Sequence, residues 1–183
     1  MRRTRLAIFL LALAMSAQIA ALAGGPGTRA GAPDDGFDLY LVRHAEKTPD
    51  PDDPALTGAG ALRAQRLAEG LAGQGIEAIW TSDYRRTRET AAPLAARLGL
   101  DPRLYDPRNL EELADRLRQA GRSALVVGHS NTTPQLAALL CACETAPMDE
   151  SEYDRLLIVT IHGSSASLRE AGQVEFTGPG IQR

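Results

Sequence analysis

Three short, mainly apolar runs, separated by segments with helical patterning, constrain the fold of this chain more than any other feature. The runs occupy residues 37–42, 76–80 and 124–127. Runs of this kind are typical of strands that are buried on both faces of a parallel sheet. Strands that alternate with helices predict a single three-layer α/β domain with a mostly parallel, doubly wound sheet.

The helix signals lie between and after these runs. Thr57 is a natural N-cap, and Leu62, Leu67 and Leu71 follow at helical spacing, so we expect them to share one buried face. Pro93 is expected to kink the next helix or to begin a new segment. The remaining elements are three helices over residues 84–98, 110–120 and 133–140, and a closing hairpin over residues 156–161 and 166–170 that would give the sheet a mixed edge.

Two of these runs are each followed, two residues later, by a histidine. Arg43 and His44 follow the first run, and Gly128 and His129 follow the third. In open α/β sheets, ligands bind just beyond the carboxyl ends of the strands. The sequence therefore predicts a site that brings two histidines and an arginine to one edge of the sheet.

The first 35 residues differ in composition from the rest of the chain. Residues 1–23 combine three arginines, an uncharged apolar stretch and small residues at Ala21-Leu22-Ala23, which is the layout of a secretory signal peptide. An uncleaved membrane anchor is the alternative, although the apolar core is short for a span of about 20 residues. Residues 24–35 are rich in Gly, Pro and Ala and predict a flexible leader, which leaves residues 36–183 for the domain. We expect an exported protein, periplasmic or secreted, that contacts membrane only through the signal segment.

The charge balance narrows the class of ligand. The net charge is −3, and removal of residues 1–23, which carry three arginines and no acidic residue, would lower it to −6. An acidic protein is a poor candidate for nucleic-acid binding, so we expect no nucleic-acid partner. Any affinity for phosphate must come from a local cluster of arginines.

The two cysteines, Cys141 and Cys143, are separated by one residue. In an exported protein they could form a local disulfide, and two ordinary thiols near a helix end are the alternative. A single pair of this kind has too few ligands for a structural zinc site, and the three histidines form no metal-binding motif. We therefore predict no metal and no cofactor.

A phosphoryl-transfer site needs positioned cations and a nucleophile, because the transition state spreads negative charge over three equatorial oxygens. Arginine binds two phosphate oxygens at once and stays charged at all physiological pH values. A neutral His44 could offer a ring nitrogen as nucleophile and form a phosphohistidine. Arg43 lies beside it in the sequence.

These residues resemble the histidine phosphatase superfamily, the phosphoglycerate mutase-like group. Its Arg-His-Gly signature matches residues 43–45, with Ala45 in place of glycine, and its Ser-x-x-x-Arg-Ala-x-x-Thr-Ala pattern matches residues 82–91. Its Leu-Thr-x-x-Gly helix start matches residues 56–60, and its second histidine matches Gly128-His129-Ser130. The four matches follow the family's order and spacing from about residue 39 to residue 140.

The resemblance implies a role for each matched residue. His44 would be the nucleophile, and Arg43, Arg86 and His129 would hold the phosphoryl oxygens without a metal. In many relatives a glutamate after the second helix protonates the leaving oxygen. Asp106 is our candidate for that general acid, and Glu111 is the alternative.

Arg85, Arg88 and His162 are expected to lie outside the site. Arg85 and Arg88 are expected on a charged helix face, since arginine is a good helix former. His162 matches no motif of the family and is expected to be structural.

The sequence thus predicts a metal-independent phosphohydrolase that acts on a small phosphorylated substrate or on a phosphoprotein. A phosphomutase is the first alternative, but it must shield the phosphoenzyme from water, which usually requires long insertions, and the connections here are short. A non-catalytic protein that binds a phosphorylated ligand is the second alternative. Retention of both histidines argues against it.

Overall fold

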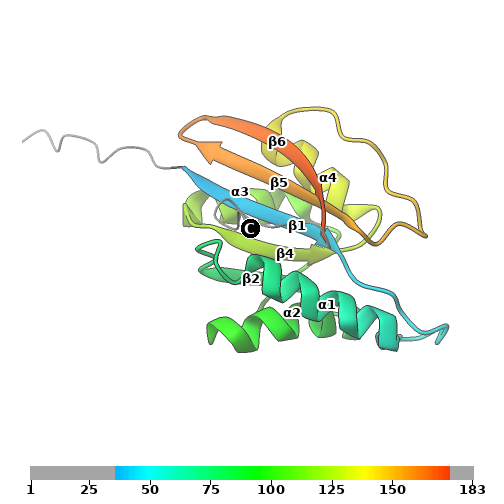
Figure 1. Ribbon diagram of the computed structural model, residues 1–183. Helices are drawn as coiled ribbons and strands as arrows, with labels where there is room; N and C mark the ends of the chain where they lie inside the picture. The colour runs from blue at the N-terminus through cyan, green and yellow to red at the C-terminus, as the bar shows by residue number, and fades with distance from the viewer. Residues whose placement is uncertain (1–35, 174–183) are drawn as a thin grey trace, which may run out of the picture. The chain divides into compact units, whose positions relative to one another are not determined.

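The computed structural model describes residues 36–173 (Figure 1). The predicted signal peptide, residues 1–23, and the predicted leader, residues 24–35, lie outside the described residues. Within residues 36–173, no helix has the length and apolarity that crossing a membrane requires.

Strands and helices alternate through most of the described chain, as the sequence predicts. Their order is β1 (Phe37–Arg43), α1 (Gly58–Leu71), β2 (Ala78–Ser82), α2 (Arg85–Leu98), β3 (Arg103–Tyr105), α3 (Leu110–Ala120), β4 (Ala124–Gly128), α4 (Thr132–Cys141), β5 (Arg155–His162) and β6 (Ser165–Gly172).

The strands form one sheet in the order β3-β2-β4-β1-β5-β6. The first four strands in that order are parallel to one another. Strand β5 is antiparallel to β1, and β5 and β6 are antiparallel to each other and form the closing hairpin. The mostly parallel, doubly wound sheet with a mixed edge is therefore confirmed. Strand β1 lies between a parallel and an antiparallel neighbour, and its carboxyl end meets that of β4.

Helices cover both faces of the sheet (Figure 1). Helices α3 and α4 pack on the face that carries Leu39 and Leu41 of β1. Helices α1 and α2 pack on the face that carries Tyr40 and Val42. Alternate residues of β1 thus enter two separate cores, because successive side chains of a strand point to opposite faces. This explains why residues 39–42 of the strand are all apolar.

Local signals account for the helix ends. The hydroxyl of Thr57 accepts a hydrogen bond from the amide of Gly60 at 3.1 Å, as an N-cap does. Helices α2 and α3 end at Gly99 and Gly121, both in the left-handed conformation, with φ of 66° and 58°. Glycine adopts that conformation without a steric penalty.

The structure corrects the expectation for Leu62, leaves one of the two alternatives at Pro93 and adds a strand. Leu62 does not share the buried face of α1 with Leu67 and Leu71; it is 56% exposed, and smaller residues such as Ala64 complete that face. Helix α2 runs through Pro93 without a new start. The short strand β3 is not predicted by the sequence, because it has three residues and two of them are exposed.

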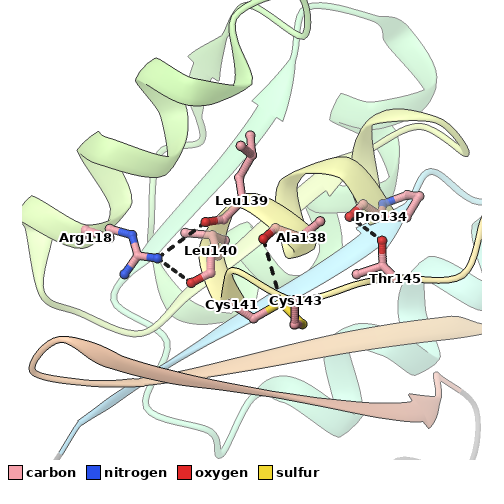
Figure 2. The surroundings of a disulfide bond; sticks show 8 residues. All are labelled: Arg118, Pro134, Ala138, Leu139, Leu140, Cys141, Cys143 and Thr145. Carbon is pink, nitrogen blue, oxygen red and sulfur yellow. Dashed lines mark hydrogen bonds between the residues drawn. A yellow bond between two sulfur atoms is a disulfide. The ribbon is translucent and has the colours of Figure 1, made fainter.

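The C-terminal end of α4 is closed by a disulfide. Cys141 and Cys143 are joined, and Ala142 between them has a φ of 51° (Figure 2). The guanidinium of Arg118, on α3, donates hydrogen bonds to the carbonyls of Leu139 and Leu140 (Figure 2). The disulfide alternative for the two cysteines is the one that the structure contains. From here residues 142–154, which we call the strap, lead back across the sheet edge to β5.

Candidate active site

Adjacent parallel strands place the two histidines side by side. In the register of β1 and β4, Arg43 pairs with Gly128, so His44 and His129 are the next residue of each strand. The amide of His44 donates a hydrogen bond to the carbonyl of Gly128 at 2.9 Å. The two imidazole rings lie 5.5 Å apart between centroids. The ends of β1 and β4 therefore lie side by side, as the sequence predicts.

Helix α2 brings Arg86 to the same edge. Strand β2 pairs with β4, so the helix that follows β2 begins next to His129. Arg86 lies in its first turn, with Nη2 3.4 Å from Nδ1 of His129. The guanidinium of Arg86 stacks over the ring of Tyr84, 4.4 Å from its centroid. A helix N-terminus attracts anions, and here it adds to the charge of the arginine.

A chain of hydrogen bonds orients His129. Its Nε2 lies 2.9 Å from the hydroxyl of Ser82, which donates to the hydroxyl of Thr87. The Thr87 hydroxyl in turn donates to backbone carbonyls. Because each hydroxyl donates onward, Nε2 of His129 must be the donor to Ser82, and Nδ1 is the nitrogen that accepts from Arg86.

His44 is oriented by its own backbone neighbour. Its Nδ1 lies 2.8 Å from the carbonyl of Ala45. A carbonyl can only accept, so Nδ1 carries the proton and Nε2 has the free lone pair. Burial, reinforced by the charges of Arg43 and Arg86, lowers the pKa of His44 to about 3. The imidazole is therefore neutral at physiological pH, which a nucleophile requires.

His129 is neutral for similar reasons. Burial, followed by the charges of Arg86 and Arg43, lowers its pKa to about 4. A bound dianion would oppose both causes, because it supplies the negative charge that favours an imidazolium.

Thr90 connects the first and second motifs. Its hydroxyl accepts a hydrogen bond from the amide of Ala45 at 3.0 Å and donates to the carbonyl of Arg86 at 2.7 Å. The same threonine therefore fixes both the backbone after His44 and the backbone of Arg86.

The third motif positions the backbone after His44. A Cβ at Gly60 would lie 2.2 Å from the carbonyl oxygen of Glu46, so only glycine permits this approach of α1. The carboxylate of Glu46 binds Arg63, which also pairs with Asp154 of the strap. These contacts tie the segment after His44 to α1 and to the strap.

Arg43 is 2% exposed and is the most heavily bonded residue of the site. Its Nη1 donates to the carbonyls of Asp149, Glu150 and Glu152, at 3.1, 2.6 and 3.2 Å. Its Nη2 pairs with the carboxylate of Glu150 at 2.8 Å. The ring of Tyr153 lies against the guanidinium, 4.3 Å from the ring centroid to Cζ. The strap is therefore built around this one arginine.

The two arginines share an unusual feature. Nε of Arg43 and Nε of Arg86 are buried and have no hydrogen-bond partner among the described residues. Buried donors are nearly always paired, because leaving one unpaired is unfavourable by about 1–3 kcal/mol. An anion that lies between the strand ends could accept from such donors.

A pocket of about 370 Å³ opens at this edge of the sheet, and Arg43 is not among its lining residues. It includes both histidines and Arg86, and its rim carries Lys47 and Arg108. Its remaining lining residues are Tyr84, Pro107, Ser130, Asn131, Thr132 and Glu150. Positive and neutral groups thus dominate the pocket that contains His44. Among residues 36–173, no three His, Cys, Asp or Glu side chains are arranged to hold a metal ion.

The carboxylates expected from the sequence lie elsewhere. Asp106 is exposed, lines a neighbouring pocket, and pairs with Arg108 at 2.9 Å. The hydrogen bond from Arg108 lowers the pKa of Asp106. Glu111 lines a separate pocket between α3 and α4. Arg85, Arg88 and His162 are exposed, and the two arginines pair with nearby carboxylates on the surface.

Sequence reasoning missed three residues of the site. Tyr84 stacks on Arg86, Tyr153 stacks on Arg43, and Glu150 binds Arg43 and the hydroxyl of Ser130. Tyr84 lies inside a matched motif at a position that the pattern leaves open. The other two belong to the strap, where no motif marks them.

Comparisons with known proteins agree with this geometry. A sequence profile of the histidine phosphatase superfamily, branch 1, matches residues 39–114. A protein of Erwinia tasmaniensis named as a probable phosphoglycerate mutase, GpmB, is 33% identical over 111 residues. That alignment spans 51% of this chain and 51% of the relative, so it reaches only about half of the length of the relative.

Solved structures share the fold. The protein histidine phosphatase SixA, complexed with tungstate, has a TM-score of 0.63 at 23% identity, covering 75% of this chain and 97% of its own. The α-ribazole phosphatase of Shigella flexneri has a TM-score of 0.61 at 16% identity, covering 74% and 96%. A mycobacterial glucosyl-3-phosphoglycerate phosphatase has a TM-score of 0.60 at 16% identity, covering 75% and 98%.

One pocket contains His44 of the signature, Arg86 at the start of α2 and His129 after β4. The profile match covers three of the four motifs, and the solved structures share the fold. Over residues 39–114 the chain therefore resembles the histidine phosphatase superfamily, and its described residues share the fold of the solved structures named above.

Proposed function

We propose that this protein is a phosphatase that hydrolyses phosphate monoesters through a phosphohistidine on His44. The observation that carries the proposal is the state of that side chain. Its Nδ1 is held by the carbonyl of Ala45, so Nε2 offers a lone pair to a pocket with two arginines beside it. A neutral, oriented imidazole in a cationic pocket is suited to attack phosphorus.

Arg43, Arg86 and His129 would together stabilise the negative charge on the phosphoryl oxygens. Arg43 and Arg86 have buried Nε–H groups without partners, and each would donate to phosphoryl oxygens. His129 stays oriented by Ser82 and would donate from Nδ1 once the bound dianion favours its protonated form. Water then attacks the phosphohistidine and releases phosphate. No step requires a metal ion, so we expect EDTA to leave the rate unchanged.

Trapping the intermediate tests the proposal. The protein is mixed briefly with a ³²P-labelled aryl phosphate and quenched in denaturant. We expect a labelled protein whose bond is labile in acid and stable in base, as a phosphoramidate is. An acid-stable adduct would contradict His44 as nucleophile, and phosphate binding without turnover would identify a non-catalytic binding protein.

A phosphomutase is the second candidate, because the relative from Erwinia tasmaniensis is named as a phosphoglycerate mutase. The pocket favours hydrolysis, since it opens to solvent at its exposed rim residues, such as Lys47 and Arg108. A mutase must keep water from the phosphoenzyme. Incubation with 3-phosphoglycerate separates the two: a phosphatase releases inorganic phosphate, and a mutase forms the 2-phosphate isomer.

The substrate we propose is a small phosphorylated compound, and a phosphoprotein is the alternative. The solved relatives named above include a protein histidine phosphatase and two phosphatases of small molecules, so the shared fold is compatible with both. The pocket of about 370 Å³ suits a phosphoryl group with a modest leaving group. A screen of phosphorylated metabolites and phosphohistidine peptides would separate the two classes.

We also propose that the protein is exported after cleavage near Ala23. The disulfide between Cys141 and Cys143 supports this location, because disulfides persist mainly in oxidising compartments. Fractionation of the source cells, followed by N-terminal sequencing of the recovered protein, tests it. Intact protein in the cytoplasm would contradict export.

A further inference from the structure

The strap contributes one carboxylate to the candidate pocket. Among the described residues that line the pocket, Glu150 is the only acidic one. It belongs to none of the motifs that identify the family in this chain. Its Oε2 lies 2.8 Å from Nη2 of Arg43, and its Oε1 accepts from the hydroxyl of Ser130.

The backbone around Glu150 is fixed to the same arginine that borders the nucleophile. Arg43 donates to the carbonyls on both sides of it, and Tyr153 packs against the guanidinium. Arg43 is also the neighbour of His44 in the chain. A phosphoryl group held by Arg43 and attacked by His44 therefore lies next to the Glu150 carboxylate.

The other candidate carboxylates do not have this placement. Asp106 is held by three hydrogen bonds from Arg108, two from the guanidinium at 2.9 and 3.0 Å and one from the backbone amide at 3.0 Å, and it lines the neighbouring pocket. Glu111 lines the pocket between α3 and α4. Neither lines the pocket that contains His44.

Binding of substrate would change the surroundings of Glu150. Without substrate, the Ser130 hydrogen bond and the charge of Arg43 hold the pKa of Glu150 below its ordinary value. A phosphoryl group that binds Arg43 would replace the carboxylate as its partner and place negative charge beside it. Both changes favour the protonated carboxyl. The side chain is 79% exposed, so it has room to turn from Arg43 toward the leaving group.

Building on the proposed phosphatase activity, we infer that Glu150 is the general acid that protonates the leaving oxygen. As the His44 Nε2–P bond forms and the P–O ester bond breaks, the carboxyl proton passes to the departing oxygen, which leaves as an alcohol. The Glu150 carboxylate then takes a proton from the water that attacks the phosphohistidine. This second step releases phosphate and restores the neutral histidine and the protonated carboxyl.

The test compares two leaving groups in Glu150→Gln. Glutamine keeps the size of the side chain but has no proton to donate. For glycerol phosphate, whose alkoxide needs a proton, we expect kcat/KM to fall on the order of a hundredfold or more. For 4-nitrophenyl phosphate, which leaves as a stable anion, we expect a change of no more than about threefold. The aryl substrate also reports that the variant is folded.

Asp106→Asn and Glu111→Gln are the matched controls, because each makes the same carboxyl-to-amide change outside the pocket. Both should keep the wild-type ratio of alkyl to aryl rates. The assignment would be overturned if Glu150→Gln lost both activities equally or kept the wild-type ratio of alkyl to aryl rates. It would also be overturned if a control variant lost alkyl activity selectively, or if the wild-type protein were inactive on alkyl phosphates. Absence of aryl turnover and of a phosphoenzyme would instead overturn the proposed phosphatase activity.

Discussion

The strand ends and the strap both contribute to the candidate site, but they are built in different ways. His44 and His129 follow hydrogen-bonded strands in the middle of the sheet, and Arg86 follows the neighbouring strand. Glu150 and Tyr153 come from a segment without regular structure, which side-chain contacts to Arg43 and Arg63 hold in place.

This difference separates two tasks. A nucleophile needs a fixed line of attack, and paired strands with cores on both faces provide that rigidity. A leaving group differs from substrate to substrate, and a segment held by side chains can change without disturbing the sheet. We therefore expect the chemistry on phosphorus to depend on the strand ends, and the response to the leaving group to depend on the strap.

The largest expected effect is at the strand end of β1. His44→Ala removes the proposed nucleophile, and we expect the rate on an aryl phosphate to fall on the order of a millionfold, as loss of a nucleophile does in other covalent enzymes. The phosphoenzyme should disappear as well. Substantial remaining turnover would show that water or another side chain attacks phosphorus directly.

Arg86→Ala tests the helix start beside the second histidine. Removing a charged donor to the transition state should reduce kcat on the order of a hundredfold to a thousandfold. Arg86→Lys should recover only part of this loss, because lysine lacks the planar fork of the guanidinium. A larger loss for alkyl than for aryl phosphates would contradict the division of roles, because it would show that Arg86 also acts on the leaving group.

The buried histidines predict a pH dependence of stability. The pKa of His44 is about 3 in the folded protein and about 6.5 when exposed, so the unfolded chain takes up this proton first as the pH falls. Stability is therefore complete above about pH 6.5 and declines toward about pH 3, by up to tenfold in the unfolding constant per pH unit. Denaturant unfolding of His44→Gln should show a shallower decline. An identical slope in the variant would contradict the buried neutral histidine.

The smallest effect is expected in the strap. Tyr153→Leu removes the ring over Arg43, a contact of about 0.5–2 kcal/mol, and should lower kcat/KM by roughly twofold to thirtyfold. The loss should be greater for glycerol phosphate than for 4-nitrophenyl phosphate, because displacing the strap also moves Glu150. A loss as large as that of Arg86→Ala on both substrates would show that the strap also serves the chemistry on phosphorus.

Much of the molecule was predictable from local patterns. The apolar runs identify the buried strands, Thr57 identifies the start of a helix, and the two strand-end histidines indicate where a ligand would bind. Each of these signals depends on residues close together in the chain. Leu62 shows the limit of such signals. It lies nine residues before Leu71, about two and a half helical turns, so it falls on the opposite side of α1 and is exposed.

The general acid shows that limit more clearly. Asp106 follows the expected element in sequence, yet β3 directs it to a neighbouring pocket, where Arg108 binds it. Glu150 lies 107 residues after Arg43 and is brought to it by three backbone carbonyls and one ion pair. No spacing in the sequence encodes a contact of that separation.

The sequence by itself determined the layered sheet, the carboxyl-end location of the site and the four motif residues there, because strand and helix periodicities and motif spacings are local properties. Only the tertiary structure decided that both histidines are neutral, that Nε2 of His44 is the free nitrogen, and that Glu150 is the carboxylate of the pocket. These depend on burial and on contacts between distant segments, which exist only after the chain has folded.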